Sequence, residues 1–218
     1  MNENINIPDF KGDDFANDKE IQKVRAEAKA YHTLVKDCLS IVRDKLNVKE
    51  AAHKNLKSFL MFKNLQATVL DSFKSTGADG LLHVSLVEYS SSYSTGKYAN
   101  AGTDHYLFGH LVTDKLFPKT YVCKETIREK ITDLFLRLEI DFEHSKKFSR
   151  KFHVLTEDKS RLINLWQFKN LDDLILFPEL ELEIHSNACL FRSSRRAISI
   201  EETFSFCELA KTLIKLLN

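Results

Sequence analysis

Two groups of basic residues are the part of this sequence whose residue types best fit a chemical role. Both lie in the second half of the chain: Lys146, Lys147, Arg150 and Lys151, and Arg192, Arg195 and Arg196. Lysine and arginine side chains bind phosphate groups, and an aromatic ring among them, such as Phe148, can pack against or stack on a bound base. The two groups predict an anion-binding surface, with nucleic acid or an acidic lipid as the candidate partner.

Acidic residues nearby offer a second interpretation of these charges. Glu179, Glu181 and Glu183 alternate along the stretch before Arg192, so a hairpin would place them opposite the arginines and neutralise them. Phe148 also fits a hydrophobic core. The chain carries 32 basic and 31 acidic side chains, a net charge of +1, which argues against a surface built as a whole for a polyanion.

No group of residues follows the spacing of a known catalytic or metal-binding motif, so we predict no cofactor and no metal ion. His105 and His110 are five residues apart in a predicted strand, hence on opposite faces, where they cannot share a metal ion. The sequence has no glycine-rich phosphate loop and no GxSxG motif. A phosphate-ester enzyme stays as the alternative function. It would use the basic groups with Asp104, Asp141 or Glu125 as acid and base, and it requires them to meet on one concave surface.

The cysteines and the N-terminus indicate a cytoplasmic protein. Four cysteines lie in apolar stretches without a CxxC pair, which predicts reduced and buried thiols: Cys38, Cys123, Cys189 and Cys207. The N-terminus lacks the basic-then-apolar order of a secretory signal. No stretch approaches the about 20 apolar residues that cross a bilayer, so we predict no transmembrane span.

The most regular hydrophobic pattern follows a polar tail of residues 1–17. Its apolar residues step by three and four: Ile21, Val24, Ala28, Tyr31, Val35, Cys38 and Val42. This spacing places them on one stripe of a helix that begins at Asp18 and can supercoil with a second helix. That second helix is either the helical pattern from Val48 to Phe73, in an antiparallel hairpin, or the same helix of another copy.

After the turn-forming residues 75–80 the period changes to the alternation of strands. Alternation predicts strands over residues 82–87, 105–112, 119–124 and 151–155, with a polar loop over 90–103. Helical patterns cover residues 126–138, 158–168, 170–177 and 200–217, and a hairpin covers 179–192 with its turn at 185–188. The sequence therefore predicts an α+β fold, a long N-terminal helical hairpin followed by an antiparallel sheet with flanking helices. Its parts are a tail of residues 1–17, a helical arm or hairpin of residues 18–75 and an α+β domain of residues 80–218.

The order of motifs from residue 59 to 217 resembles a family of uncharacterised bacterial proteins of unknown function. The similar motifs are YSSSYSTGKY, IDF, FSRKFHVLTED and SIEETFSF, and the most specific part is residues 140–158. The resemblance implies a soluble α+β domain, often preceded in relatives by paired transmembrane helices; in this chain a charged helical arm precedes it. The family implies no catalytic residues.

These patterns favour a non-catalytic module that binds a protein partner or a second copy of itself through the helical arm. The candidate interface residues are Ile21, Val24, Ala28, Tyr31, Val35 and Val42. Within this stripe, Tyr31 and Val35 are expected to lie in the contact.

Overall fold

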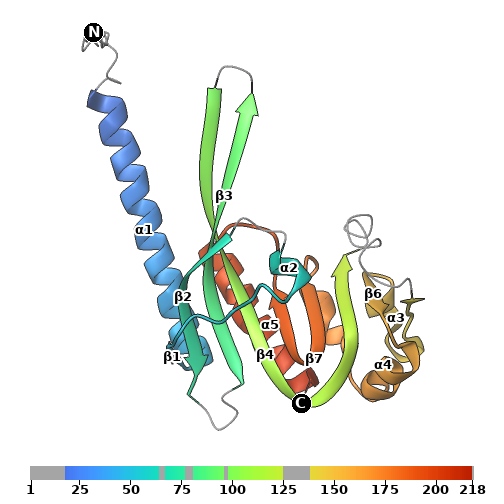
Figure 1. Ribbon diagram of the computed structural model, residues 1–218. Coiled ribbons are helices and arrows are strands. Elements are labelled where there is room, and N and C mark those ends of the chain that lie inside the picture. The colour runs from blue at the N-terminus through green and yellow to red at the C-terminus, as the bar shows by residue number, and fades with distance from the viewer. Residues whose placement is uncertain (1–17, 64–66, 77–80, 96–97, 125–137, 218) are drawn as a thin grey trace, which may run out of the picture.

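The computed structural model describes residues 18–63, 67–76, 81–95, 98–124 and 138–217, which form an antiparallel sheet with most of the helices packed on one face (Figure 1). The strands are β1 (Val48–Glu50), β2 (Ala67–Ser75), β3 (Leu82–Thr95), β4 (Tyr98–Lys124), β5 (Leu138–Glu139), β6 (Phe152–Thr156) and β7 (Glu181–Arg192). The helices are α1 (Asp18–Leu46), α2 (Leu60–Lys63), α3 (Lys146–Ser149), α4 (Lys159–Trp166) and α5 (Ile200–Leu217), with the 3₁₀ turns η2 (Glu143–Ser145) and η3 (Leu171–Leu176). The predicted α+β class with an antiparallel sheet is confirmed.

Strand β4 is the longest strand and connects the two parts of the sheet. The strand order is β1-β2-β3-β4-β6-β5, and β7 also pairs with β4. Leu111 pairs with both Leu82 of β3 and Cys189 of β7, so these two strands flank β4 on opposite sides. The first part of β4 pairs with β3 as a long two-stranded ribbon. Strand β7 pairs with residues 109–112 and 120–122 of β4, and β6 pairs with the last residues of β4, 120–124.

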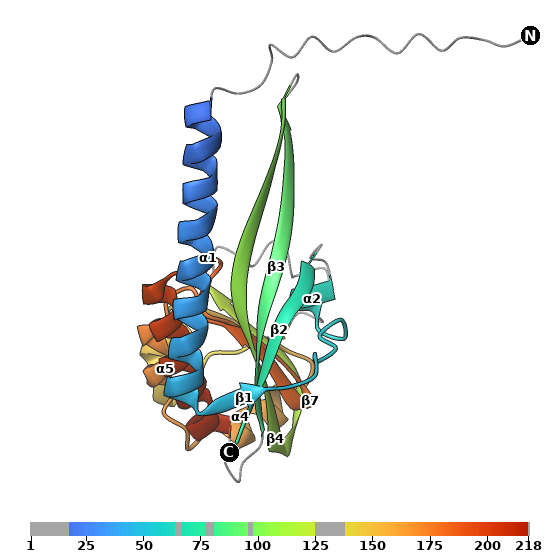
Figure 2. The same ribbon diagram turned by 90° about the vertical axis from the view of Figure 1, so that its left-hand side faces the viewer.

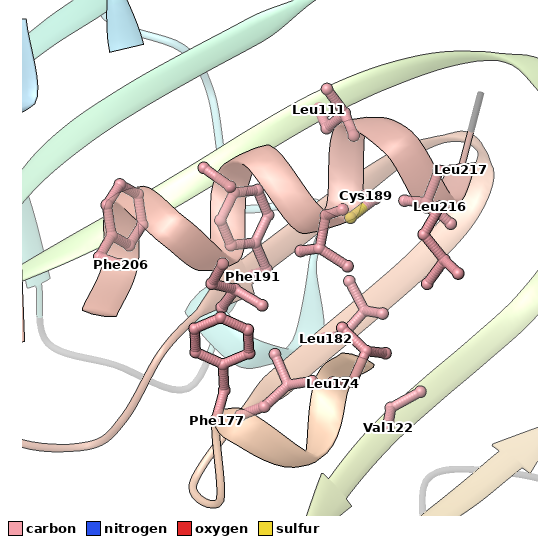
Figure 3. Close-up of a cluster of buried hydrophobic side chains, with 14 of the residues drawn as sticks. Leu111, Val122, Leu174, Phe177, Leu182, Cys189, Phe191, Phe206, Leu216 and Leu217 are labelled. Carbon is pink, nitrogen blue, oxygen red and sulfur yellow. The ribbon is translucent and has the colours of Figure 1, made fainter. Parts of the chain in front are cut away.

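The main hydrophobic core lies between the sheet and the helices α1, α4, α5 and η3. Side chains of α5 interlock with those of β4, β7 and η3 in this layer (Figure 3). At its centre the rings of Phe191 and Phe206 stack with centroids 5.5 Å apart. A fully buried aromatic side chain removes about 150–250 Å² from water, so this stack is a major contribution to the core.

A smaller core covers the opposite face of the sheet. The segment that contains α2 supplies Leu56, Phe59, Met61 and Phe62, which pack on Val87, Phe108, Tyr121 and Leu190. The buried carboxylate of Glu183 accepts hydrogen bonds from the backbone N–H groups of Leu60 and Met61, each at 2.9 Å. These bonds satisfy two donors at the start of α2 and fix the segment to β7.

Helix α1 and the β3–β4 ribbon both extend beyond the body on the same side of the molecule (Figure 2). The last part of α1 is anchored, since Cys38, Leu39, Val42 and Leu46 are buried in the main core. Most of the residues of α1 before Leu34 are exposed to solvent. The helix ends at Asn47, whose positive φ of 48° reverses the chain into β1.

The structure does not confirm the helical hairpin. Residues 48–73 form β1, an irregular segment, α2 and most of β2, and both strands pair within the same sheet as β3. The step of four between Val69 and Phe73 suggests the helical period of 3.6, but the residues lie in a strand, whose period is two. A bulge between Val69 and Asp71 turns Val69 towards the smaller core and Phe73 towards the main core. Pairing with β3 decides between the two periods.

The predicted hairpin of residues 179–192 is confirmed within β7. Its first and last residues lie together, since the Glu181 carboxylate accepts a hydrogen bond from Nε of Arg192 at 2.8 Å, whereas a continuous strand of this length would hold them more than about 30 Å apart. Ser186, in the predicted turn of residues 185–188, has a positive φ of 58°, and both halves of β7 pair with β4. One further element differs from its prediction: within the predicted polar loop of residues 90–103, residues 90–95 continue β3 and residues 98–103 begin β4, paired with each other.

The predicted helix from Asp158 is present as α4, and the Asp158 carboxylate caps it by accepting a hydrogen bond from the backbone N–H of Arg161 at 3.0 Å. The predicted final helix is α5, with the bounds expected from its apolar spacing. The helical prediction for residues 126–138 lies outside the described residues except for Leu138, which is in β5. The predicted tail also lies outside them.

Candidate functional site

The exposed part of α1, residues 21–34, is called the α1 arm below. Along its stripe, Val24 is 63% exposed and Ala28 is exposed, while Ile21 is only partly covered. Further along the same stripe, Val42 is fully buried against the body. The apolar stripe is therefore covered by the body at its C-terminal end and exposed towards its N-terminal end, although some residues of the exposed part have contacts within the chain.

Tyr31 and Val35 mark the transition from the arm to the body. The Tyr31 hydroxyl lies 3.0 Å from Nδ1 of His105, at the base of the ribbon, and the two rings are 5.5 Å apart. On its other side, Nε2 of His105 lies 3.6 Å from a carboxylate oxygen of Glu88. Val35 packs against the main core. Both stripe residues are half-buried within the chain, so the exposed part of the candidate interface is formed by Ile21, Val24 and Ala28.

The first basic group lies on and beside α3. Lys146, Lys147 and Arg150 are exposed, and the ammonium group of Lys151 donates a hydrogen bond to the Ile175 carbonyl at 2.7 Å. Phe148, in the middle of the group, is fully buried. The aromatic ring thus belongs to the core and is closed to a stacking base.

The second basic group is neutralised in part by β7. The buried carboxylate of Glu181 accepts hydrogen bonds from Nε of Arg192 at 2.8 Å and from Nε of Arg195 at 2.6 Å. Both guanidinium groups also bring Nη2 to the same carboxylate. Arg196 pairs separately with Glu179, at 3.1 Å, and with Glu202, at 3.6 Å.

The structure keeps the two basic groups apart. Phe148, in the middle of the first group, is buried in the main core on the helical face of the sheet, whereas Arg192 lies over Phe108, which belongs to the smaller core of the opposite face. The surface required by a phosphate-ester enzyme is therefore not formed by the described residues. Of its candidate acid–base groups, Asp104 lies on the ribbon side and Asp141 beside α3, and Glu125 is outside the described residues.

Arg192 and Arg195 border a pocket that the sequence did not predict, called the Arg pocket below. Its volume is about 200 Å³, and its walls are Val87, Tyr89, Tyr106, Phe108, Arg192 and Arg195. The Arg192 guanidinium lies over the Phe108 ring, 5.5 Å from its centroid. Burial raises the pKa of Tyr106, so this wall stays uncharged. Strand register was the missing signal, because Val87 and Tyr106 are directly paired neighbours in the ribbon.

A second pocket, of about 310 Å³, lies near the C-terminal end of α5. It is bordered by Phe168 and Leu176, which are 91% and 76% exposed, together with Lys169 and Lys215. Desolvation and the charge of Lys115 lower the pKa of Lys169. The pocket thus combines exposed apolar side chains with a cationic edge.

The pKa values of His110 and of two buried cysteines lie away from the range that suits acid–base or nucleophilic catalysis at neutral pH. Burial lowers the pKa of His110 to about 4, with a further contribution from the charge of Lys54. Burial raises the pKa of Cys123 to about 12 and that of Cys207 to about 11, which keeps these thiols protonated and inert. No cluster of three metal-ligating side chains occurs among the described residues.

No helix in the part of the chain that the structure describes is long and apolar enough to span a bilayer. Comparison of the chain with protein-family models, with curated proteins and with solved structures finds no match. The resemblance drawn from the sequence motifs therefore stays an expectation.

Proposed function

We propose that the protein is a non-catalytic interaction module that binds a helix of a protein partner through the α1 arm. The observation that carries this proposal is the exposure of Val24, at 63%, on a stripe whose continuation is buried in the body. A second copy of the chain is one such partner, since its own α1 presents the same stripe.

The physical argument concerns the stability of the arm. Isolated helices shorter than about 12–15 residues are marginal in water, and most helices in proteins are stabilised by packing of an apolar face. The arm, roughly 20 Å long at 1.5 Å per residue, lacks that packing over most of its length. Full burial of a side chain such as Val24 against a partner contributes about 1.5–3 kcal/mol.

The polar residues of the arm suit a paired helix. Lys23 and Glu27 form an exposed pair one turn apart, at 4.0 Å, and both signs of charge occur along the arm. Charged residues beside an apolar seam set partner choice and orientation in helical pairs. The arrangement supports recognition of a second amphipathic helix rather than of a polyanion.

The test compares matched substitutions on two faces of the arm. Ala28→Lys places a charge on the stripe, whereas Ala30→Lys makes the same change two residues further along, about 200° around the helix. We expect the wild type and the Ala30→Lys variant to form a dimer, measured by light scattering during size-exclusion chromatography, and Ala28→Lys and Val24→Lys to shift the mass to that of a monomer. If the wild type is a monomer, the same variants are compared in capture of a partner from extract.

Identical behaviour of Ala28→Lys and Ala30→Lys in both assays would refute the proposal. Circular dichroism of each variant checks that α1 remains helical, so that loss of the helix is not mistaken for loss of the interface.

A further inference from the structure

The Arg pocket presents aromatic walls and two guanidinium groups at one place on the sheet. We propose that it binds a small ligand made of a single aromatic ring and an oxyanion, either a carboxylate or a phosphate ester. This inference is independent of the proposed function of the α1 arm, because none of the residues that line the pocket belongs to α1.

The first argument is the imbalance of charge. Two arginines share one carboxylate, Glu181, so the group keeps one excess positive charge. Arg192 is only 8% exposed, so bulk water screens that charge poorly. Arg196 pairs with two carboxylates, Glu179 and Glu202, which offset the excess over the loop as a whole. None of these three residues lines the pocket, so the positive charge at its walls remains. An anion in the pocket would neutralise the excess.

The second argument is the set of donors that remain. A guanidinium group has five N–H donors in a fixed planar fork, and Glu181 engages the Nε and Nη2 edge of both arginines. Among the described residues, the Nη1 groups have no acceptor. Glu181, which is fully buried, holds the two forks in fixed positions, so a ligand would not have to order them. Carboxylates and phosphates match this fork geometry.

The third argument is the shape and size of the walls. Tyr89 and Tyr106 are diagonal neighbours on the ribbon, with their rings in a T-shaped arrangement and the centroids 6.4 Å apart, and Phe108 also lines the pocket. The volume of about 200 Å³ is below the range of about 300–1,000 Å³ typical of sites for drug-sized molecules. A single ring with one anionic substituent fits this space, whereas a dinucleotide does not.

The alternative is that Glu181 and the arginines only attach residues 193–199 to the sheet. In that case the pocket would have no affinity for anions beyond that of any positively charged surface. In the ligand-binding interpretation, the affinity for an anion depends on an aromatic ring in the ligand and on which arginine is replaced. In the alternative, the affinity depends on neither.

The experiment titrates the purified protein with benzoate and with phenyl phosphate at fixed ionic strength, and follows binding by ligand-observed NMR. Acetate and inorganic phosphate test the need for the ring, and benzyl alcohol tests the need for the anion. Arg195→Gln removes a pocket donor whose side chain is 42% exposed and which is therefore replaceable, and Arg196→Gln is the matched control in the same loop. Tyr89→Ala removes one wall without touching the buried charges.

We expect saturable binding of benzoate or phenyl phosphate, with a dissociation constant on the order of 1 mM or below. The benzoate and phenyl phosphate arms decide between the carboxylate and the phosphate ester. Arg195→Gln should weaken binding about tenfold or more, Tyr89→Ala should weaken it several-fold, and Arg196→Gln should leave it unchanged. Absence of saturable binding by both aromatic anions, or an equal loss in Arg195→Gln and Arg196→Gln, would overturn the proposal. If Arg195→Gln does not fold, the Tyr89→Ala variant decides: unchanged affinity of this variant for the aromatic anions would also overturn the proposal.

Discussion

Replacement of Glu181 by glutamine tests whether the buried charges stabilise the fold as the structure indicates. The Glu181 side chain is fully buried and is the common partner of Arg192 and Arg195. Removing one partner of a buried ion pair typically costs about 3–5 kcal/mol, because a charge is left buried without compensation. Arg192, with 10% of its side chain exposed, should account for most of this loss, whereas Arg195, at 42%, can be solvated by water.

We expect Glu181→Gln to lower the free energy of unfolding by about 3 kcal/mol in urea titrations, a large part of the about 5–15 kcal/mol of a typical domain. Glu179→Gln is the matched control, since Glu179 pairs with Arg196, whose side chain is 63% exposed, and such pairs contribute about 0–1 kcal/mol. The double variant Glu181→Leu/Arg192→Met should recover much of the loss, because apolar residues of similar volume often replace a buried pair at little cost. Equal losses in Glu181→Gln and Glu179→Gln would refute the reasoning.

Two further predictions concern the core. Gly109→Ala would place its Cβ against the Phe191 ring, which is already stacked on Phe206. We expect the free energy of unfolding, measured in urea, to fall by about 1–3 kcal/mol. An unchanged free energy of unfolding would contradict this contact. Burial lowers the pKa of His110 to about 4 in the folded state, whereas in the unfolded state a histidine has a pKa of about 6.5. Between these two pH values only the unfolded state binds the proton. The free energy of unfolding should therefore be constant above about pH 6.5 and fall by up to about 1.4 kcal/mol per pH unit from there to pH 4. In urea titrations between pH 7 and pH 5, His110→Gln should flatten this slope. The control His32→Gln, at an exposed residue, should leave the slope unchanged. Equal slopes for the two variants would show that His110 is not the group responsible.

The sequence predicted those elements whose signals are local. The cap at Asp158 and the apolar spacing of the last helix identify α4 and α5, because both signals depend only on residues a few positions apart. These features need no knowledge of what the segment packs against.

Elements decided by long-range pairing were not predictable in the same way. Glu181 and Glu183 alternate with leucines, which in an isolated hairpin would place them in solvent. In the structure both are buried, because the α2 segment and the arginines cover that face of β7. The Arg pocket was missed for the same reason. Its walls come from β3, β4, β7 and the loop after β7, and only the register of the ribbon brings Val87 next to Tyr106.

The position of Gly109 connects the core to the Arg pocket. Gly109 pairs with Phe191, and the absence of a side chain lets the Phe191 ring lie against β4. Arg192 follows Phe191 and points to the opposite face of β7, where it lies over the Phe108 ring. A residue that displaces Phe191 from β4 should therefore also move the guanidinium of Arg192. Loss of anion binding in Gly109→Ala, with the fold retained at low temperature, would show that packing on the helical face sets the geometry of the pocket on the other face.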